Sequence, residues 1–88
     1  MKLKYDFIIQ EVAGNFMAVA TGAGAQSFKG MIRLNGTAKR MFELIQEGKD
    51  EAQIVETMSQ EYEVAKEDLE TAVSNFVGSL KKENLIEA

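Results

Sequence analysis

The sequence has 88 residues, a formal net charge of −4 and 45% hydrophobic residues, with no cysteine, histidine or proline. Its length predicts a single globular domain over residues 1–88. Because cysteine and histidine are missing, disulfides, thiolate metal sites and the usual general base near neutral pH are excluded. The acidic balance opposes binding to nucleic acid and to anionic membrane surfaces.

The first third of the chain predicts three strands. Residues 6–12 and residues 16–21 form a hairpin, because the intervening Ala-Gly-Asn supplies residues that tolerate positive φ. Residues 22–27 (GAGAQS) predict a surface loop, and no Gly-Lys-Ser/Thr follows that would make it a phosphate-binding loop. The third strand covers residues 28–34, with Phe28, Ile32 and Leu34 on one face. Its other face carries Lys29, Met31 and Arg33.

The rest of the chain predicts three helices. The first starts at the N-cap Asn35 and ends near Gly48, where a left-handed residue is favoured. The second covers residues 50–62 and opens with a capping-box pair, Asp50 and Gln53. The third covers residues 65–83. Its expected central stripe is Leu69, Val73, Phe76 and Leu80, flanked by Ala72 and Val77. The order of elements predicts an α+β fold: a three-stranded antiparallel sheet followed by three helices, winged-helix-like.

The sequence offers no catalytic constellation. The acidic residues of the second and third helices lie on predicted polar faces, and no histidine is present to activate a serine. We therefore expect a protein that is not an enzyme, with no cofactor and no metal. A winged helix that binds DNA is an alternative, but the third helix begins Lys-Glu-Asp-Leu-Glu, and its three carboxylates repel phosphates.

The class of function that remains is recognition of a protein or peptide. A small sheet has edges whose unpaired N–H and C=O groups can pair with an extended peptide. Alternatively, Lys29 and Arg33 merely blunt the edge against other strands.

At this point the sequence resembles the PqqD family, the small proteins of pyrroloquinoline quinone biosynthesis. The most specific segments are Leu34-Asn35-x-Thr37-Ala38 and Glu61-Tyr62-x-Val64. The other residues that carry the resemblance are Ile32, Arg33, Gly36, Phe42, Leu44, Ile45, Gly48, Ile54, Val55, Phe76, Leu80, Leu85 and Ile86. The resemblance covers nearly the whole chain. In one departure, Ala65 stands where the family often has an Asp or Ser cap.

The N-terminus lacks the apolar core of a signal peptide and no apolar run is long enough to span a bilayer, so a cytoplasmic protein is expected. The resemblance implies a non-catalytic adaptor, an element that recognises the leader of a ribosomally made precursor peptide. The leader would add as a strand beside the third strand and rest against the third helix, and a radical S-adenosylmethionine enzyme or another peptide-modifying enzyme would then act on it. The implied site residues are Lys29, Gly30, Met31, Ile32, Arg33, Leu34, Leu69, Ala72, Val73, Phe76, Val77 and Leu80. Among these, Phe76 and Leu80 are expected mainly in the core, and Ala72, Val73 and Val77 are expected to line the groove.

Two further questions stay open at this stage. The chain could instead be a structural subunit that docks to a biosynthetic enzyme without holding a peptide. It could also act as a monomer or as a homodimer formed through the same open edge.

Overall fold

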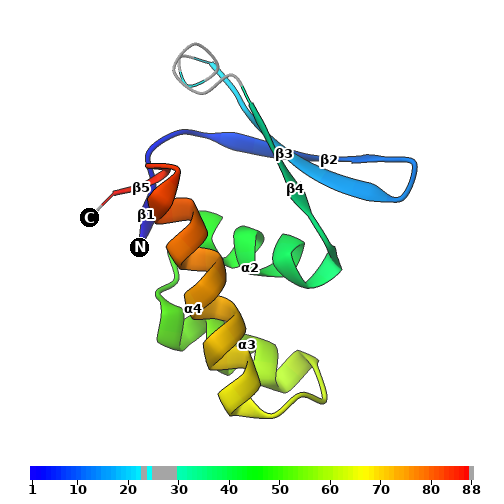
Figure 1. Ribbon diagram of the computed structural model, residues 1–88, viewed down its shortest axis with the longest axis vertical. Coiled ribbons are helices and arrows are strands. Elements are labelled where there is room, and N and C mark those ends of the chain that lie inside the picture. Colours follow the sequence, from blue (N-terminus) through cyan, green and yellow to red (C-terminus); the bar gives the residue numbers. More distant parts are fainter. Residues whose placement is uncertain (23, 25–29, 88) are drawn as a thin grey trace.

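The computed structural model describes residues 1–22, 24 and 30–87. In chain order, its elements are β1 (Lys2–Leu3), β2 (Phe7–Val12), β3 (Asn15–Ala20), β4 (Met31–Leu34), α2 (Gly36–Gln46), α3 (Glu51–Glu61), α4 (Lys66–Lys82) and β5 (Ile86–Glu87). Figure 1 shows the sheet of β2, β3 and β4 on one side of the three helices. This arrangement confirms the predicted α+β fold. The start of the expected third strand, residues 28 and 29, and most of the expected loop lie outside the described residues.

A tight hairpin joins β2 and β3, as the sequence predicts. Val12 pairs with Asn15, and the two residues between them have positive φ, 53° at Ala13 and 80° at Gly14. Positive φ at both central positions belongs to type I′ turns, whose twist matches that of the flanking strands. β4 then pairs antiparallel with β3, so the sheet has the order β2-β3-β4 and β4 forms one of its edges.

The two faces of this sheet differ in burial. On the face toward the helices, Phe7, Ala18, Ala20 and Leu34 are buried in the core. Phe7 meets Phe42 of α2 edge-on, with the ring centroids 5.4 Å apart. Successive residues of a strand point to opposite faces, and the residues between these four are partly or largely exposed. The predicted division of β4 into a buried and an exposed face is therefore confirmed for residues 31–34.

Local capping fixes the ends of α2. The Asn35 side chain accepts a hydrogen bond from the Ala38 N–H at 2.7 Å, as expected for the predicted N-cap. Gly48 has φ 88°, and its N–H donates to the Ile45 carbonyl while the Lys49 N–H donates to the Leu44 carbonyl. These two bonds form a Schellman motif, which requires the left-handed residue that glycine supplies at low cost.

The second helix, α3, begins with the predicted capping box and is tied to α2 by an ion pair at its other end. Asp50 accepts from the Gln53 N–H at 2.8 Å, and the Gln53 side chain accepts from the Asp50 N–H at 3.0 Å. Arg40 of α2 donates two hydrogen bonds to the Glu61 carboxylate, at 2.8 and 2.7 Å. This bidentate bond lowers the pKa of Glu61 and raises that of Arg40.

The third helix, α4, starts without a side-chain cap. Ala65 has the extended backbone of an N-cap, and its carbonyl accepts from the N–H groups of Asp68 and Leu69. Its methyl side chain, however, cannot accept a hydrogen bond from the first turn. The helix start that the sequence predicts is thus confirmed, together with its weak cap.

Replacing Ala65 with Ser should raise the free energy of unfolding by about 0.5–2 kcal/mol, because a hydroxyl at the N-cap satisfies an orphan N–H group. Denaturant unfolding monitored by circular dichroism measures the change. Ala72→Ser, at an exposed position inside the same helix, is the matched control and should lower stability by up to about 0.7 kcal/mol through helix propensity. An unchanged midpoint for Ala65→Ser would contradict the cap.

The two ends of the chain meet in a second, small sheet that the sequence did not predict. Lys2 pairs with Glu87 and Leu3 with Ile86, and the Lys4 N–H donates to the Leu85 carbonyl at 2.8 Å. Leu85 and Ile86 are buried, so the C-terminal end of the described chain packs on the core. Within the described residues, none of the helices has the length and apolar character needed to cross a bilayer.

Candidate functional site

The direction of each backbone group in the sheet follows from one hydrogen bond. The Thr21 N–H donates to the Asp6 carbonyl at 2.9 Å, so these two residues, just beyond the Phe7–Ala20 pair, form a hydrogen-bonded pair. Bonded and non-bonded pairs alternate along an antiparallel ladder. Val19, two residues before Thr21, therefore directs its N–H and C=O toward β2, and Ala18 directs its own toward β4.

Applied to β4, this alternation identifies the groups on its outer side. Ile32 lies opposite Ala18 and bonds to β3, whereas Met31 and Arg33 lie opposite Val19 and Met17. The N–H and C=O groups of Met31 and Arg33 therefore point away from the sheet. No described strand pairs with that side of β4. The edge thus offers two donors and two acceptors in the geometry that a further strand requires.

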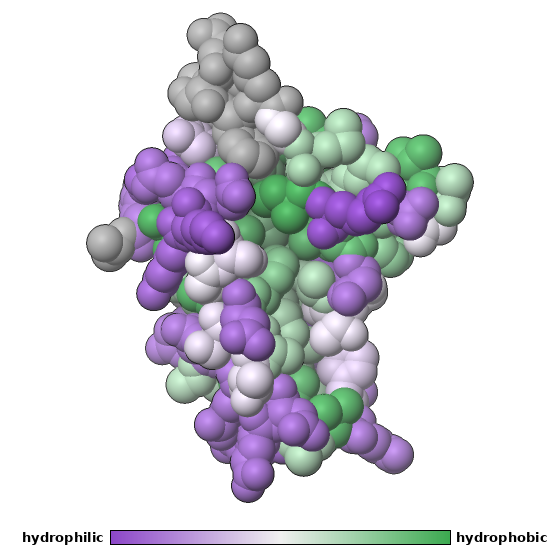
Figure 2. Space-filling model, in the orientation of Figure 1, coloured by the Kyte–Doolittle hydropathy of each residue, from purple (hydrophilic) through white to green (hydrophobic). Residues whose placement is uncertain are grey.

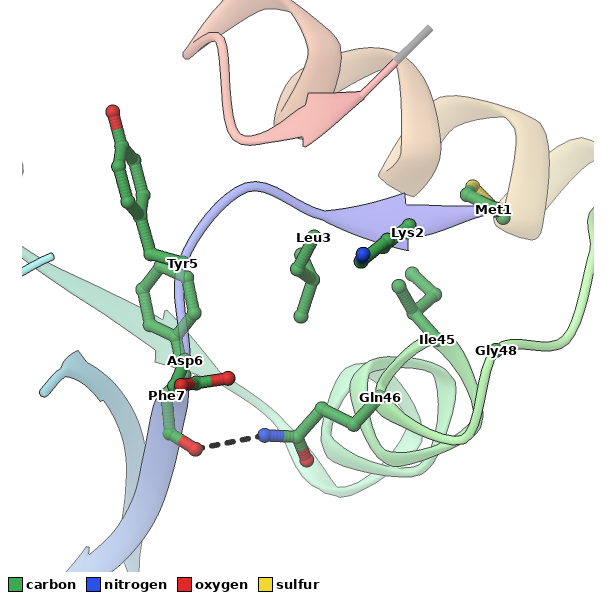
Figure 3. Close-up of a pocket in the computed structure, with 9 residues that line it drawn as sticks. All are labelled: Met1, Lys2, Leu3, Tyr5, Asp6, Phe7, Ile45, Gln46 and Gly48. Carbon is green, nitrogen blue, oxygen red and sulfur yellow. Dashed lines mark hydrogen bonds between the residues drawn. The ribbon is translucent and has the colours of Figure 1, made fainter.

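The opposite edge of the sheet, along β2, is partly closed. By the same alternation, Phe7 directs its backbone away from β3, and its carbonyl accepts a hydrogen bond from the Gln46 side-chain amide at 2.9 Å. Figure 3 shows this bond beside a pocket of about 210 Å³ between the N-terminal segment and the end of α2. A strand that added to β2 would have to displace Gln46, so β4 is the more accessible edge.

Apolar side chains lie next to the open edge. In the view of Figure 1, β4 and α4 lie on either side of the start of α2. Figure 2 shows hydrophobic residues gathered between them, with hydrophilic residues on both sides. Ile32, Ala38 and Phe76 are partly buried against the core, and Ala72 is exposed. An extended segment on β4 would thus find main-chain partners at the edge and apolar contacts beside it.

The flank of α4 that is available differs from the expected one. Val73 and Val77, expected to line a groove, are 0% and 1% exposed, and with Leu69 and Leu80 they form the buried stripe. Phe76, expected mainly in the core, is only partly buried. The reason is helical spacing: after Val73, either Phe76 or Val77 continues a 3.6-residue period. The helix turns the β-branched residue inward and leaves the aromatic ring at the margin.

The side of α4 that carries Ala72 and Phe76 faces away from α3. On its other side, Lys66 lies 3.3 Å from Glu56 of α3, and Lys66 and Glu70 line a hollow with Val55. Ala72 and Phe76 are four residues apart and so form one row on the helix, about half a turn from Glu70. This row is a partly exposed, apolar part of α4.

The predicted site residues therefore separate into three groups. Gly30, Met31, Ile32 and Arg33 lie at or next to the open edge, Ala72 and Phe76 form the partly exposed row of α4, and those in the core are Leu34, Leu69, Val73, Val77 and Leu80. Lys29 lies outside the described residues. Sequence reasoning did not include Ala38 in the site; this residue is partly buried in the first turn of α2, four residues after the end of β4. It also missed the Gln46 bond, which joins residues 39 positions apart.

The chemistry of this edge is that of binding. The described residues contain no group of three or more Asp and Glu side chains arranged to hold a metal ion. Two of the charged groups on or near the described sheet are the Arg33 side chain on β4 and Lys39, whose ammonium lies 5.0 Å from the centre of the Phe16 ring. Outward-directed backbone groups at a sheet edge, next to partly buried apolar side chains, suit recognition of an extended chain.

Comparison with known proteins places the chain in a family. The family model for coenzyme PQQ synthesis protein D (PqqD) matches residues 8–86. Among solved structures, TbiB1 in complex with the TbiA(beta) leader peptide is 22% identical with a TM-score of 0.76, over 100% of this chain and 96% of TbiB1. Lasso peptide synthetase B1 complexed with the leader peptide is 21% identical with a TM-score of 0.72, over 98% of this chain and 95% of the synthetase chain. No curated protein matches. The fold is shared with both structures, and the family match, which spans most of the sequence, shows that this chain belongs to the PqqD family.

Proposed function

We propose that this protein is a non-catalytic adaptor that binds the leader segment of a ribosomally synthesised precursor peptide and presents it to a modifying enzyme. The observation that carries the proposal is the open edge of β4, with the backbone groups of Met31 and Arg33 directed outward beside an apolar strip. The family membership and the two similar structures, each a complex with a leader peptide, support it.

The geometry suggests how a leader would bind. Backbone hydrogen bonds to Met31 and Arg33 would hold an extended peptide without regard to most of its sequence. Alternate side chains of that peptide would point toward the helix side of the sheet, where Ile32 and Phe76 are only partly buried. Apolar residues at every second position of the leader would therefore gain most from binding.

The modifying enzyme is the second partner of the proposed adaptor. The resemblance to PqqD proteins implies a radical S-adenosylmethionine enzyme or another enzyme that modifies peptides. The adaptor's own role would be to raise the local concentration of the precursor at that enzyme. We expect the isolated chain to bind its peptide without turning it over.

An NMR titration tests the peptide site directly. The probe is a synthetic leader of a short precursor encoded next to this protein, added to the ¹⁵N-labelled chain. The largest amide shifts should fall on residues 31–34, followed by Ala72 and Phe76 on α4. The amides of Ile9 and Glu11, on the outer side of β2, serve as the internal control and should change little, because Gln46 already occupies part of that edge.

Two results would contradict the proposal. Shifts confined to β2 or to α3 would mean that the peptide uses another surface. No shift with the cognate leader, combined with direct binding to the modifying enzyme, would favour the structural docking subunit. A sequence-specific DNA complex is not expected, since α4 opens with Glu67 and Asp68 in its first turn.

A further inference from the structure

The face of the sheet that points away from the helices carries mostly apolar side chains, and several of them are exposed among the described residues. Its members alternate along the three strands with the buried residues and are called here the outer face: Ile8, Gln10, Val12, Asn15, Met17, Val19, Met31 and Arg33. Ile8 is 47%, Val12 54% and Met31 62% exposed. Among the described residues, Val64 is the one other large hydrophobic residue with comparable exposure, at 46%. Exposed apolar residues gathered on one face indicate an interaction surface.

The charge of the outer face sets it apart from the rest of the protein. The chain contains 14 acidic residues, but none of the eight outer-face residues is acidic and Arg33 is their single charged member. Asp6, which pairs with Thr21 just beyond these residues, is the acidic residue that continues the same alternation along β2. A matching surface would be apolar at its centre and would carry a carboxylate opposite Arg33 at its margin. The acidic surface elsewhere on this chain would repel the carboxylate of such a partner.

The outer face is continuous with the proposed peptide site. A peptide strand added to β4 extends the same sheet, and every second side chain of that peptide would stand on the outer face next to Met31 and Arg33. A protein that covers this face would therefore contact the adaptor and the bound peptide together. That property suits the enzyme that receives the peptide, and it would let the enzyme distinguish the loaded adaptor from the empty one.

We propose that the outer face docks the peptide-modifying enzyme and that peptide bound to β4 completes this docking surface. The proposal rests on the proposed function for its coupling to the peptide, but the docking face itself is independent of peptide binding. Because the two ligands share one surface, each should raise the affinity of the other by the same factor. We expect the leader to tighten enzyme binding at least fivefold.

The test measures peptide and enzyme binding separately. The probes are the fluorescent leader and the purified modifying enzyme encoded in the same gene cluster, read by anisotropy and by biolayer interferometry. The variants are Val12→Asp and Ile8→Lys, on the strand farthest from the peptide edge. Both should retain peptide affinity within twofold, which also reports correct folding, and both should lose at least tenfold in enzyme affinity. Val64→Asp, a matched change of an exposed valine outside the sheet, should alter neither.

Unchanged enzyme affinity in both outer-face variants would overturn the proposal, as would the absence of any complex between the wild-type chain and the enzyme. Sedimentation tests whether a second copy of this chain occupies the face instead. The face would be assigned to a second copy if the wild type is a dimer and Val12→Asp dissociates it without weakening enzyme binding. If the wild-type chain binds the enzyme through this face but fails to bind the leader, the proposed function fails while the docking face stands.

Discussion

Replacing Arg33 with Pro should weaken leader binding by roughly 10- to 100-fold and leave the protein folded. Arg33 directs its N–H away from the sheet, so the substitution removes a donor that a peptide would use and no donor that β4 uses. The lost bond and the unsatisfied peptide carbonyl together cost about 1–3 kcal/mol. Fluorescence anisotropy with the labelled leader gives the affinity, and circular dichroism checks the fold.

Two further variants separate the backbone effect from its alternatives. Arg33→Ala removes the same charge and keeps the N–H, so its affinity for the leader should stay close to that of the wild type if the hydrogen bond dominates. Ile32→Pro removes a donor that bonds to β3 and should destabilise the sheet itself. Equal losses of affinity in Arg33→Pro and Arg33→Ala would show that the side chain, and not strand addition, holds the peptide.

Signals carried by neighbouring residues predicted the local structure well. Asn35, the pair Asp50 and Gln53, and Gly48 each determine a helix end through bonds that span at most five residues. The turn between β2 and β3 is equally local. The order of these elements along the chain was enough to predict the fold class as well. The use of the β4 edge, in contrast, was implied only by the resemblance to the PqqD family.

Features that depend on packing between distant segments could not be predicted in the same way. Gln46 closes part of the β2 edge by bonding to Phe7, and β1 pairs with β5 from the opposite end of the chain. No local pattern encodes either contact. On α4, two residues fit the helical period equally well, and only the shape of the core decides that Val77 is buried and Phe76 lies at its margin.

The difference between buried and exposed residues of α4 leads to the largest expected change in stability. Val73→Asp should unfold most of the protein, because Val73 is 0% exposed at the centre of the buried stripe. The change removes the burial of a valine side chain, worth about 1.5–3 kcal/mol, and places a carboxyl where no described polar group can pair with it. An 88-residue domain has a total stability of only about 4–13 kcal/mol. Denaturant unfolding should show a greatly lowered midpoint or no cooperative transition.

Ala72→Asp is the matched change one residue earlier on the same helix. Ala72 is exposed and lies in the row with Phe76, so an aspartate there keeps its hydration and the fold should persist with a loss below about 1 kcal/mol. The carboxylate would nevertheless stand where an apolar leader side chain is expected, and leader affinity should fall by about tenfold or more. Full peptide affinity in Ala72→Asp would remove this flank of α4 from the site and restrict peptide contacts to the edge of β4. A folded Val73→Asp variant with selectively impaired peptide binding would instead return Val73 to the groove, where the sequence first placed it.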